Sequence, residues 1–192
     1  MRRFFIIALL AVVVFSCVPN KQAVQQDVVD ESSAVELTFV YTRLGGVASN
    51  QYAVWIENSD GQLIKSLYAS KWTADGGYSR RPTSIPMWIE KSNRANMTKE
   101  QVDAVSGATP RTGEVSHVWD GTDDNGVFVP NGAYVLVLEA TLRWENQAYY
   151  RAPITLGQGA SIAQVNVEYV SGDRDTTAER SMISDFVVNV LR

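Results

Sequence analysis

The sequence has only one cysteine and one histidine among its 192 residues. A single thiol cannot form a disulfide within the chain, and the usual zinc and haem sites draw on more His and Cys ligands than are present. A secreted domain without disulfides must be held together by a substantial hydrophobic core. The sequence therefore indicates a domain stabilised by packing, and it predicts no metal site.

Basic residues are also in short supply. The chain has 17 Lys and Arg against 21 Asp and Glu, a formal net charge of −4. This balance argues against binding to nucleic acid and against a purely electrostatic hold on anionic lipid. We therefore expect no nucleic-acid partner.

Long apolar runs are absent except at the N-terminus, where residues 4–15 are continuously apolar. That run is too short to span a bilayer as a helix. It follows Arg2 and Arg3 and ends in Ser16-Cys17, which is the layout of a secretory signal. We expect residues 1–16 to be a signal peptide and exclude them from the fold.

The end of this signal, residues 14–17, resembles a bacterial lipobox, in which a small residue precedes the cysteine that becomes lipidated. The resemblance implies that Cys17 is the lipidated N-terminus of the mature chain. An ordinary cleaved signal with an incidental cysteine is the alternative. Residues 17–34 are polar without a regular period, as in a flexible tether. The expected location is the periplasmic side of a bacterial membrane, on a lipid anchor.

The remainder, residues 35–192, contains short alternating or apolar segments separated by turn residues. The expected strands are 35–41, 52–57, 63–68, 114–119, 127–129, 133–144, 147–156, 163–170 and 181–191. Short strands at such spacing are typical of an antiparallel β-sandwich. The predicted fold class is mainly β, in one domain.

One insertion, at about residues 69–113, breaks the β pattern. Pro86 suits the first turn of a short helix. Thr98 and Gln101 fit a capping box for a second helix that ends near Val105. Insertions of this length are usually functional or disordered, and the Trp and Met content here argues against disorder.

Two resemblances cover much of the domain. The acidic stretch 119–134 resembles the hairpin signature of the immunoglobulin-like domain of flagellar hook-capping proteins, which implies an Ig-like sandwich. Residues 53–57, 61, 67–68, 86–88 and 103–109, together with the acidic hairpin, resemble a family of predicted periplasmic proteins of unknown function, the one numbered twenty-two seventy-one. Its members look like associates of periplasmic flavin-transfer and membrane electron-transfer genes.

The motif Asp-Ala-Val-Ser-Gly-Ala-Thr at 103–109 is similar to the acceptor motif of covalently flavinylated bacterial proteins. In those proteins a periplasmic flavin transferase moves FMN from FAD onto the last threonine as a phosphoester. The resemblance implies that Thr109 carries FMN. The residues expected to form the cofactor site are Thr109, Asp103, Ser106, Gly107 and Ala108.

If the motif accepts FMN, three of its residues have a physical role in the attachment. Gly107 would let the backbone approach the phosphate, Ala108 would leave room, and Asp103 would hydrogen-bond the loop. The alternative is a purely structural loop, with Gly107 in a left-handed turn that ends a helix.

Other residues could bind a ligand or a metal, but each of them also has an ordinary structural explanation. Aromatic residues of the insertion could stack on the flavin ring, with a nearby arginine at its phosphate, or could simply pack. The residues in question are Trp72, Tyr78, Trp88, Arg80, Arg81 and Arg111. The acidic residues of 120–125 could hold calcium, but their spacing does not fit an EF-hand, and Asp, Asn and Gly favour turns. His117 should be half-buried on a strand, and no nucleophile elbow supports a serine triad.

These features predict a periplasmic lipoprotein that carries FMN covalently, or assists its use, in envelope electron transfer. It would be a carrier rather than an enzyme with an organic substrate. Expected partners are the flavin transferase, a membrane redox protein and the membrane itself. The alternative is a non-catalytic Ig-like binding or structural module of an envelope assembly.

Overall fold

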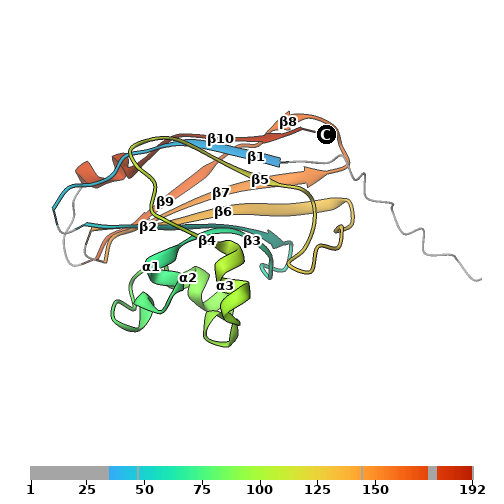
Figure 1. Cartoon of the computed structure of the whole chain (residues 1–192). Coiled ribbons are helices and arrows are strands. Elements are labelled where there is room, and N and C mark those ends of the chain that lie inside the picture. The colour runs from blue at the N-terminus through green and yellow to red at the C-terminus, as the bar shows by residue number, and fades with distance from the viewer. Residues whose placement is uncertain (1–34, 47, 144, 173–176, 192) are drawn as a thin grey trace, which may run out of the picture.

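The computed structural model describes residues 35–46, 48–143, 145–172 and 177–191. These residues form two β-sheets that face each other, with a layer of short helices on the outer face of one sheet (Figure 1). The signal peptide, Cys17 and the tether lie outside the described residues. A mainly β fold with a helical insertion is confirmed, whereas the immunoglobulin-like topology stays a prediction.

The smaller sheet has four strands in the order β5-β1-β10-β8, all antiparallel. Its strands are β1 Val35–Tyr41, β5 Gly113–Trp119, β8 Ser161–Ile162 and β10 Ile183–Val190. In β1 every second side chain is buried, as the alternating sequence predicts. The buried set faces the larger sheet.

The larger sheet has six strands in the order β4-β3-β2-β6-β7-β9. Its strands are β2 Ala48–Asn58, β3 Leu63–Ser70, β4 Ser106–Gly107, β6 Gly132–Arg143, β7 Gln147–Leu156 and β9 Asn166–Val170. The predicted antiparallel pairing holds for the other strands of this sheet, but β4 runs parallel to β3, so the sheet is mixed at this edge. The chain leaves β3, passes through the helices and returns beside β3 in the same direction.

Two apolar clusters lie on opposite faces of the larger sheet. The inner cluster joins both sheets and includes Phe39 and Tyr52. The outer cluster joins the sheet to the helices and includes Trp55, Trp88 and Val137. Because β2 is covered on both faces, its apolar residues form an uninterrupted run, as the sequence indicated.

The helical layer consists of short elements. They are α1 Lys71–Ala74, η1 Gly77–Ser79, α2 Pro86–Lys91, η2 Arg94–Asn96 and α3 Lys99–Val105, with η3 Thr177–Met182 elsewhere. Pro86 occupies the first turn of α2, and the capping box of Thr98 and Gln101 is present. Both helix predictions are confirmed.

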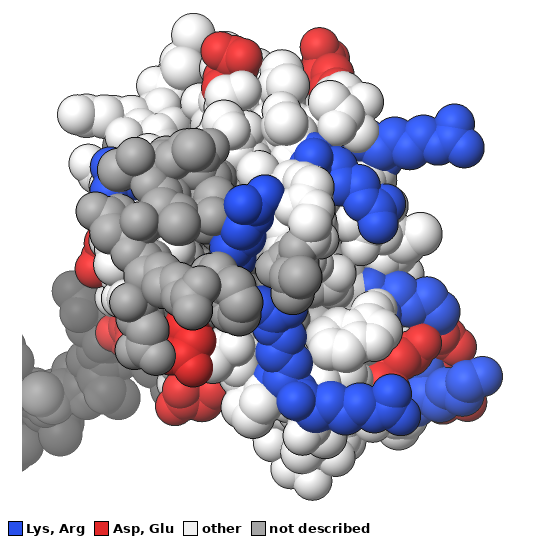
Figure 2. Space-filling model, turned by 90° about the vertical axis from the view of Figure 1, so that its left-hand side faces the viewer, with Lys and Arg blue, Asp and Glu red and all other residues white. Residues whose placement is uncertain are grey.

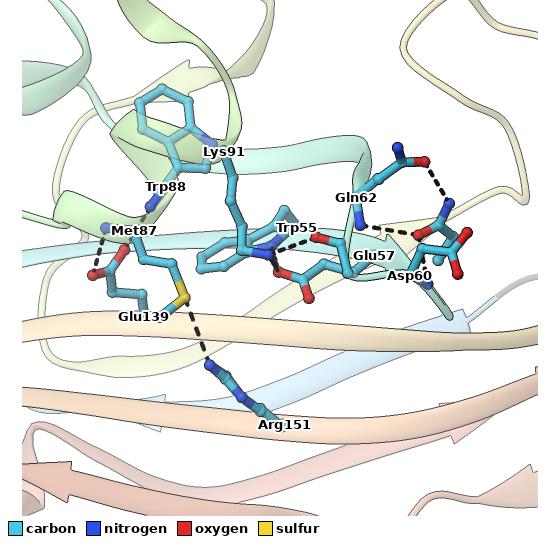
Figure 3. Close-up of polar contacts among 11 residues, drawn as sticks. Trp55, Glu57, Asp60, Gln62, Met87, Trp88, Lys91, Glu139 and Arg151 are labelled. Atoms are coloured by element: carbon cyan, nitrogen blue, oxygen red, sulfur yellow. Dashed lines mark hydrogen bonds and ion pairs between the residues drawn. The ribbon is translucent and has the colours of Figure 1, made fainter.

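Polar contacts fix α2 to the sheet beneath it (Figure 3). The carboxylate of Glu139, buried on β6, accepts the backbone N–H groups of Met87 and Trp88 at 3.1 and 2.9 Å. Lys91, at the other end of α2, pairs with Glu57 at 2.9 Å. Glu139 therefore satisfies donors that every helix leaves free at its start.

Two strand predictions are corrected. The expected strand 127–129 is reduced to a single bridge between Thr122 and Phe128. The expected strand 163–170 is shortened to β9, which pairs with β7, and the two residues of β8 just before it pair with β10. The chain changes sheets between them, so one continuous strand cannot form.

Candidate functional site

The candidate acceptor segment is ordered along the edge of the larger sheet. Ser106 and Gly107 pair with Ala69 and Ser70 of β3. The hydroxyl of Tyr68 donates to the carbonyl oxygens of Gly107 and Ala108, both at 3.1 Å. We call residues 106–112 the acceptor loop.

Residue 107 is a glycine because a side chain there would collide with Tyr68, and not because the backbone forms a turn. Its φ is not positive, so the left-handed turn considered from the sequence is wrong. A Cβ on this residue would lie 2.7 Å from Cε2 of Tyr68, closer than real contacts allow. The absent side chain therefore lets the Tyr68 ring sit under the loop.

Thr109 follows the two residues that Tyr68 contacts, and its side chain is half-buried. Its Oγ1 accepts a long hydrogen bond of 3.4 Å from Nε2 of Gln51. Oε1 of Gln51 accepts in turn from Thr73 at 3.0 Å, and Thr73 contacts Ser84 at 2.7 Å. Within the part of the chain that the structure describes, the Thr109 hydroxyl donates to no acceptor, so its proton is available.

The other polar residues of the motif have different roles from those expected. Asp103 is exposed, and its carboxylate pairs with Lys71 at 3.0 Å and with Lys99 at 3.7 Å. The Lys71 ammonium lowers the pKa of this carboxyl. Asp103 thus ties α3 to α1 instead of bonding the loop as predicted. The Ser106 hydroxyl is buried and has no partner among the described residues.

The acceptor loop lies at an end of the molecule where cations gather. Its Thr112 accepts the backbone N–H of Arg43 at 3.0 Å, and Arg143 donates to the carbonyl of Gly45 in the same neighbouring turn. Figure 2 looks onto this end and shows a band of Lys and Arg side chains. Arg43 and Arg111 are exposed. Although the chain as a whole has a net negative charge, the positive charge at this end favours binding of an anionic phosphate.

The aromatic candidates divide into packed and exposed residues. Trp88 is fully buried in the outer cluster, so packing explains it and stacking on a ligand does not. Tyr78 lies under the guanidinium of Arg94, 5.9 Å from it. Trp72 is 46% exposed and borders a surface hollow with Arg80. Of these three side chains, only that of Trp72 is exposed.

The acidic stretch forms a turn, as the structural interpretation predicted. Oδ1 of Asp123 accepts the N–H groups of Asn125 and Val127 at 2.8 and 2.9 Å. These bonds lower its pKa. Oδ1 of Asp124 accepts the N–H of Ser66 at 3.1 Å, which joins the turn to β3. Within the described ranges no group of three or more His, Cys, Asp and Glu could hold a metal ion.

His117 is half-buried on β5, as predicted. Its Nε2 lies 3.3 Å from the hydroxyl of Tyr52, and its ring centroid lies 5.1 Å from that of Tyr68. Burial lowers its pKa to about 4, so the ring is neutral at ordinary pH. His117 is part of an aromatic cluster behind the acceptor loop.

Sequence reasoning missed Tyr68 and Gln51 as neighbours of the motif. Tyr68 appeared only among the matching residues of a family resemblance, and Gln51 precedes an apolar strand without any distinctive pattern. Both reach the acceptor loop through the pairing of β3 with β4 and through the β2–β3 hairpin. No local signal in the sequence announces these contacts.

Comparison with known proteins yields a family but no individual relative. Residues 33–172 match the family model described as "Predicted periplasmic protein (DUF2271)". No curated protein and no solved structure matches. Among the described residues, no helix has the length and apolar character needed to cross a membrane.

Proposed function

This chain belongs to the DUF2271 family of predicted periplasmic proteins, and on that premise we propose that it is a lipid-anchored carrier of FMN bound covalently to Thr109. The observation that carries the proposal is the state of the Thr109 hydroxyl. It ends a motif of the flavin-acceptor type, it is partly accessible, and it donates to no group among the described residues. The cationic end around it supports approach of a phosphate.

The attachment forms one bond and breaks another. Oγ1 of Thr109 would attack the FMN phosphorus of FAD, the pyrophosphate bond to AMP would break, and the hydroxyl proton would leave with the base of a flavin transferase. On this chain, Gln51 orients the oxygen from behind. Arg43 and Arg111 lie on the segments that would face the phosphate. Bound FMN supplies one- and two-electron transfer, for which a membrane redox protein is the proposed partner.

Substitution of Thr109 by alanine tests the proposal. Wild-type protein incubated with FAD, magnesium and a flavin transferase should gain the mass of one FMN ester and fluoresce in a denaturing gel. Thr109→Ala should gain neither, because no hydroxyl remains at that position. It should stay folded, since a substitution in a surface loop costs within about 0.5 kcal/mol.

Two hydroxyls of the same loop provide matched controls. Thr112→Ala removes an exposed hydroxyl, and Ser106→Ala removes a buried one without a partner. Both variants should still be labelled. An unlabelled wild-type protein, beside an established acceptor labelled in the same reaction, would favour the alternative of a non-catalytic Ig-like module in an envelope assembly.

The lipid anchor is a separate prediction. Cys17 follows the apolar signal run at the position that lipoproteins modify. Cells fed a labelled fatty acid should incorporate it into the wild-type protein, and Cys17→Ala should lose that label completely. A mutant that keeps the full label would show that the lipid, if present, is attached elsewhere.

A further inference from the structure

We propose that the flavin ring carried on Thr109 rests against the indole of Trp72. The hollow there measures about 290 Å³ and is bordered by Trp72, Asp75, Gly76, Gly77 and Arg80. This inference rests on the proposed attachment to Thr109 and adds a binding site for the ring. Three features of α1 and its neighbours support this site.

The first feature is the fixed position of the indole. A Cβ on Gly77 would lie 2.4 Å from the carbonyl oxygen of Trp72 and 2.6 Å from Cδ2 of its ring. One side of the indole therefore lies directly on the Gly77 backbone. Yet the side chain remains 46% exposed. An exposed aromatic ring that is held in place offers a stacking surface at little cost in side-chain entropy.

The second feature is closeness to the acceptor hydroxyl. Gly107 pairs with Ser70, and α1 begins at the next residue. One carboxamide, that of Gln51, contacts both Thr109 at 3.4 Å and Thr73 at 3.0 Å. Thr73 directly follows Trp72 in the chain. Thr109 and Trp72 thus lie on adjacent segments of the chain fold.

The third feature is the charge in the hollow. Asp75 shares the Lys71 ammonium with Asp103, at 3.6 and 3.0 Å, and the exposed Arg80 places a guanidinium at the rim of the hollow. Two-electron reduction places negative charge on the N1–C2 carbonyl side of a flavin. A nearby cation stabilises that charge and so raises the reduction potential.

A second hollow, of about 180 Å³, lies beneath α3 and is the competing location for the ring. It is bordered by Ser66, Ser92, Met97, Gln101, Ala104, Val105 and Asp124. Its walls come from the start of the motif rather than from the segment beside Thr109. We use Met97 as the control residue for it.

The experiment uses the full chain loaded with FMN, with loading measured by intact mass. Electron transfer from a stacked indole quenches flavin fluorescence, so the loaded wild-type protein should be dim and should brighten several-fold on denaturation. Trp72→Ala should load equally and be bright while folded. Arg80→Gln should stay dim and show a more negative flavin potential. Met97→Ala should match the wild type in fluorescence.

The outcomes separate the two proposals. Absence of the mass increment overturns the attachment to Thr109 and this site with it. A full mass increment with a bright folded wild type, or with Trp72→Ala as dim as the wild type, overturns the Trp72 site alone. Brightening in Met97→Ala but not in Trp72→Ala would move the ring to the hollow under α3 and contradict the inference.

Discussion

Replacing Trp88 by alanine should lower the free energy of unfolding by about 3–5 kcal/mol, the usual cost of removing a large buried aromatic side chain. The indole of Trp88 is fully buried between α2 and the outer face of the larger sheet, in the cluster that contains Trp55. Its Nε1 donates to Oγ of Ser66 at 3.0 Å, so the substitution leaves a cavity and an unpaired hydroxyl. Urea denaturation followed by far-ultraviolet circular dichroism measures the loss.

Trp72 supplies the matched control for this prediction. It belongs to the same insertion but is 46% exposed, so Trp72→Ala should cost at most about 1 kcal/mol. Equal losses in the two variants would contradict the distinction between a packing tryptophan and an exposed one. They would also remove the basis for the stacking site.

Substitution of Glu139 by glutamine should change how stability depends on pH. Burial raises the pKa of Glu139 to about 7, although the N–H groups of Trp88 and Met87 and the nearby Tyr149 and Arg151 act in the opposite direction. The folded protein thus holds a proton that the unfolded chain releases near its ordinary pKa. Stability from this group is fully present below about pH 4.5 and is lost as pH rises through 7, on the order of 3 kcal/mol in all.

His117 produces a slope of the opposite sign in an overlapping range. Burial lowers its pKa to about 4, so the unfolded state binds the extra proton between about pH 4 and 6.5. Stability from His117 therefore rises with pH across that range. In the wild-type protein the two slopes offset each other between about pH 4.5 and 6.5, where the stability curve should be nearly flat.

Two variants separate these contributions in denaturant titrations at several pH values. In Glu139→Gln the free energy of unfolding should rise with pH between about 4 and 6.5, because only His117 then titrates there, and it should no longer fall as pH approaches 7. His117→Phe keeps an aromatic ring in the cluster and should expose a steady decline with rising pH. Parallel curves for the wild type and Glu139→Gln from pH 5 to 8 would show that Glu139 does not titrate there.

The sequence predicts those parts of the fold that depend on local patterns. Alternation in 35–41 is enough to identify β1, and the Thr98–Gln101 capping box is enough to begin α3. The apolar run at 52–57 correctly indicated a strand buried on both faces. In each case the side chains that signal the element are also the ones that stabilise it.

The parts that could not be predicted depend on contacts between distant residues. The sequence near Gly107 is compatible with a left-handed turn, whereas in the structure this residue pairs with Ser70 of β3 and lies against the ring of Tyr68. Asp103 looked like a support for its own loop, but Lys71 of α1 binds it. The late start of β9, at Asn166, follows from the chain crossing from the smaller sheet, where β8 pairs with β10, to the larger sheet. None of these partners lies close enough in sequence to leave a pattern.

The pairing of β1 with β10 constrains the order in which the chain can fold. Val35 pairs with Val190, so the first and the last strands of the domain are neighbours. The β2–β3 and β6–β7 hairpins can form from adjacent segments, but the smaller sheet is complete only when the C-terminal strand is present. Such contacts between distant segments slow folding. A chain released progressively into the periplasm would therefore expose part of the inner face of its larger sheet until β10 emerged, which is the interval in which it most needs protection from aggregation.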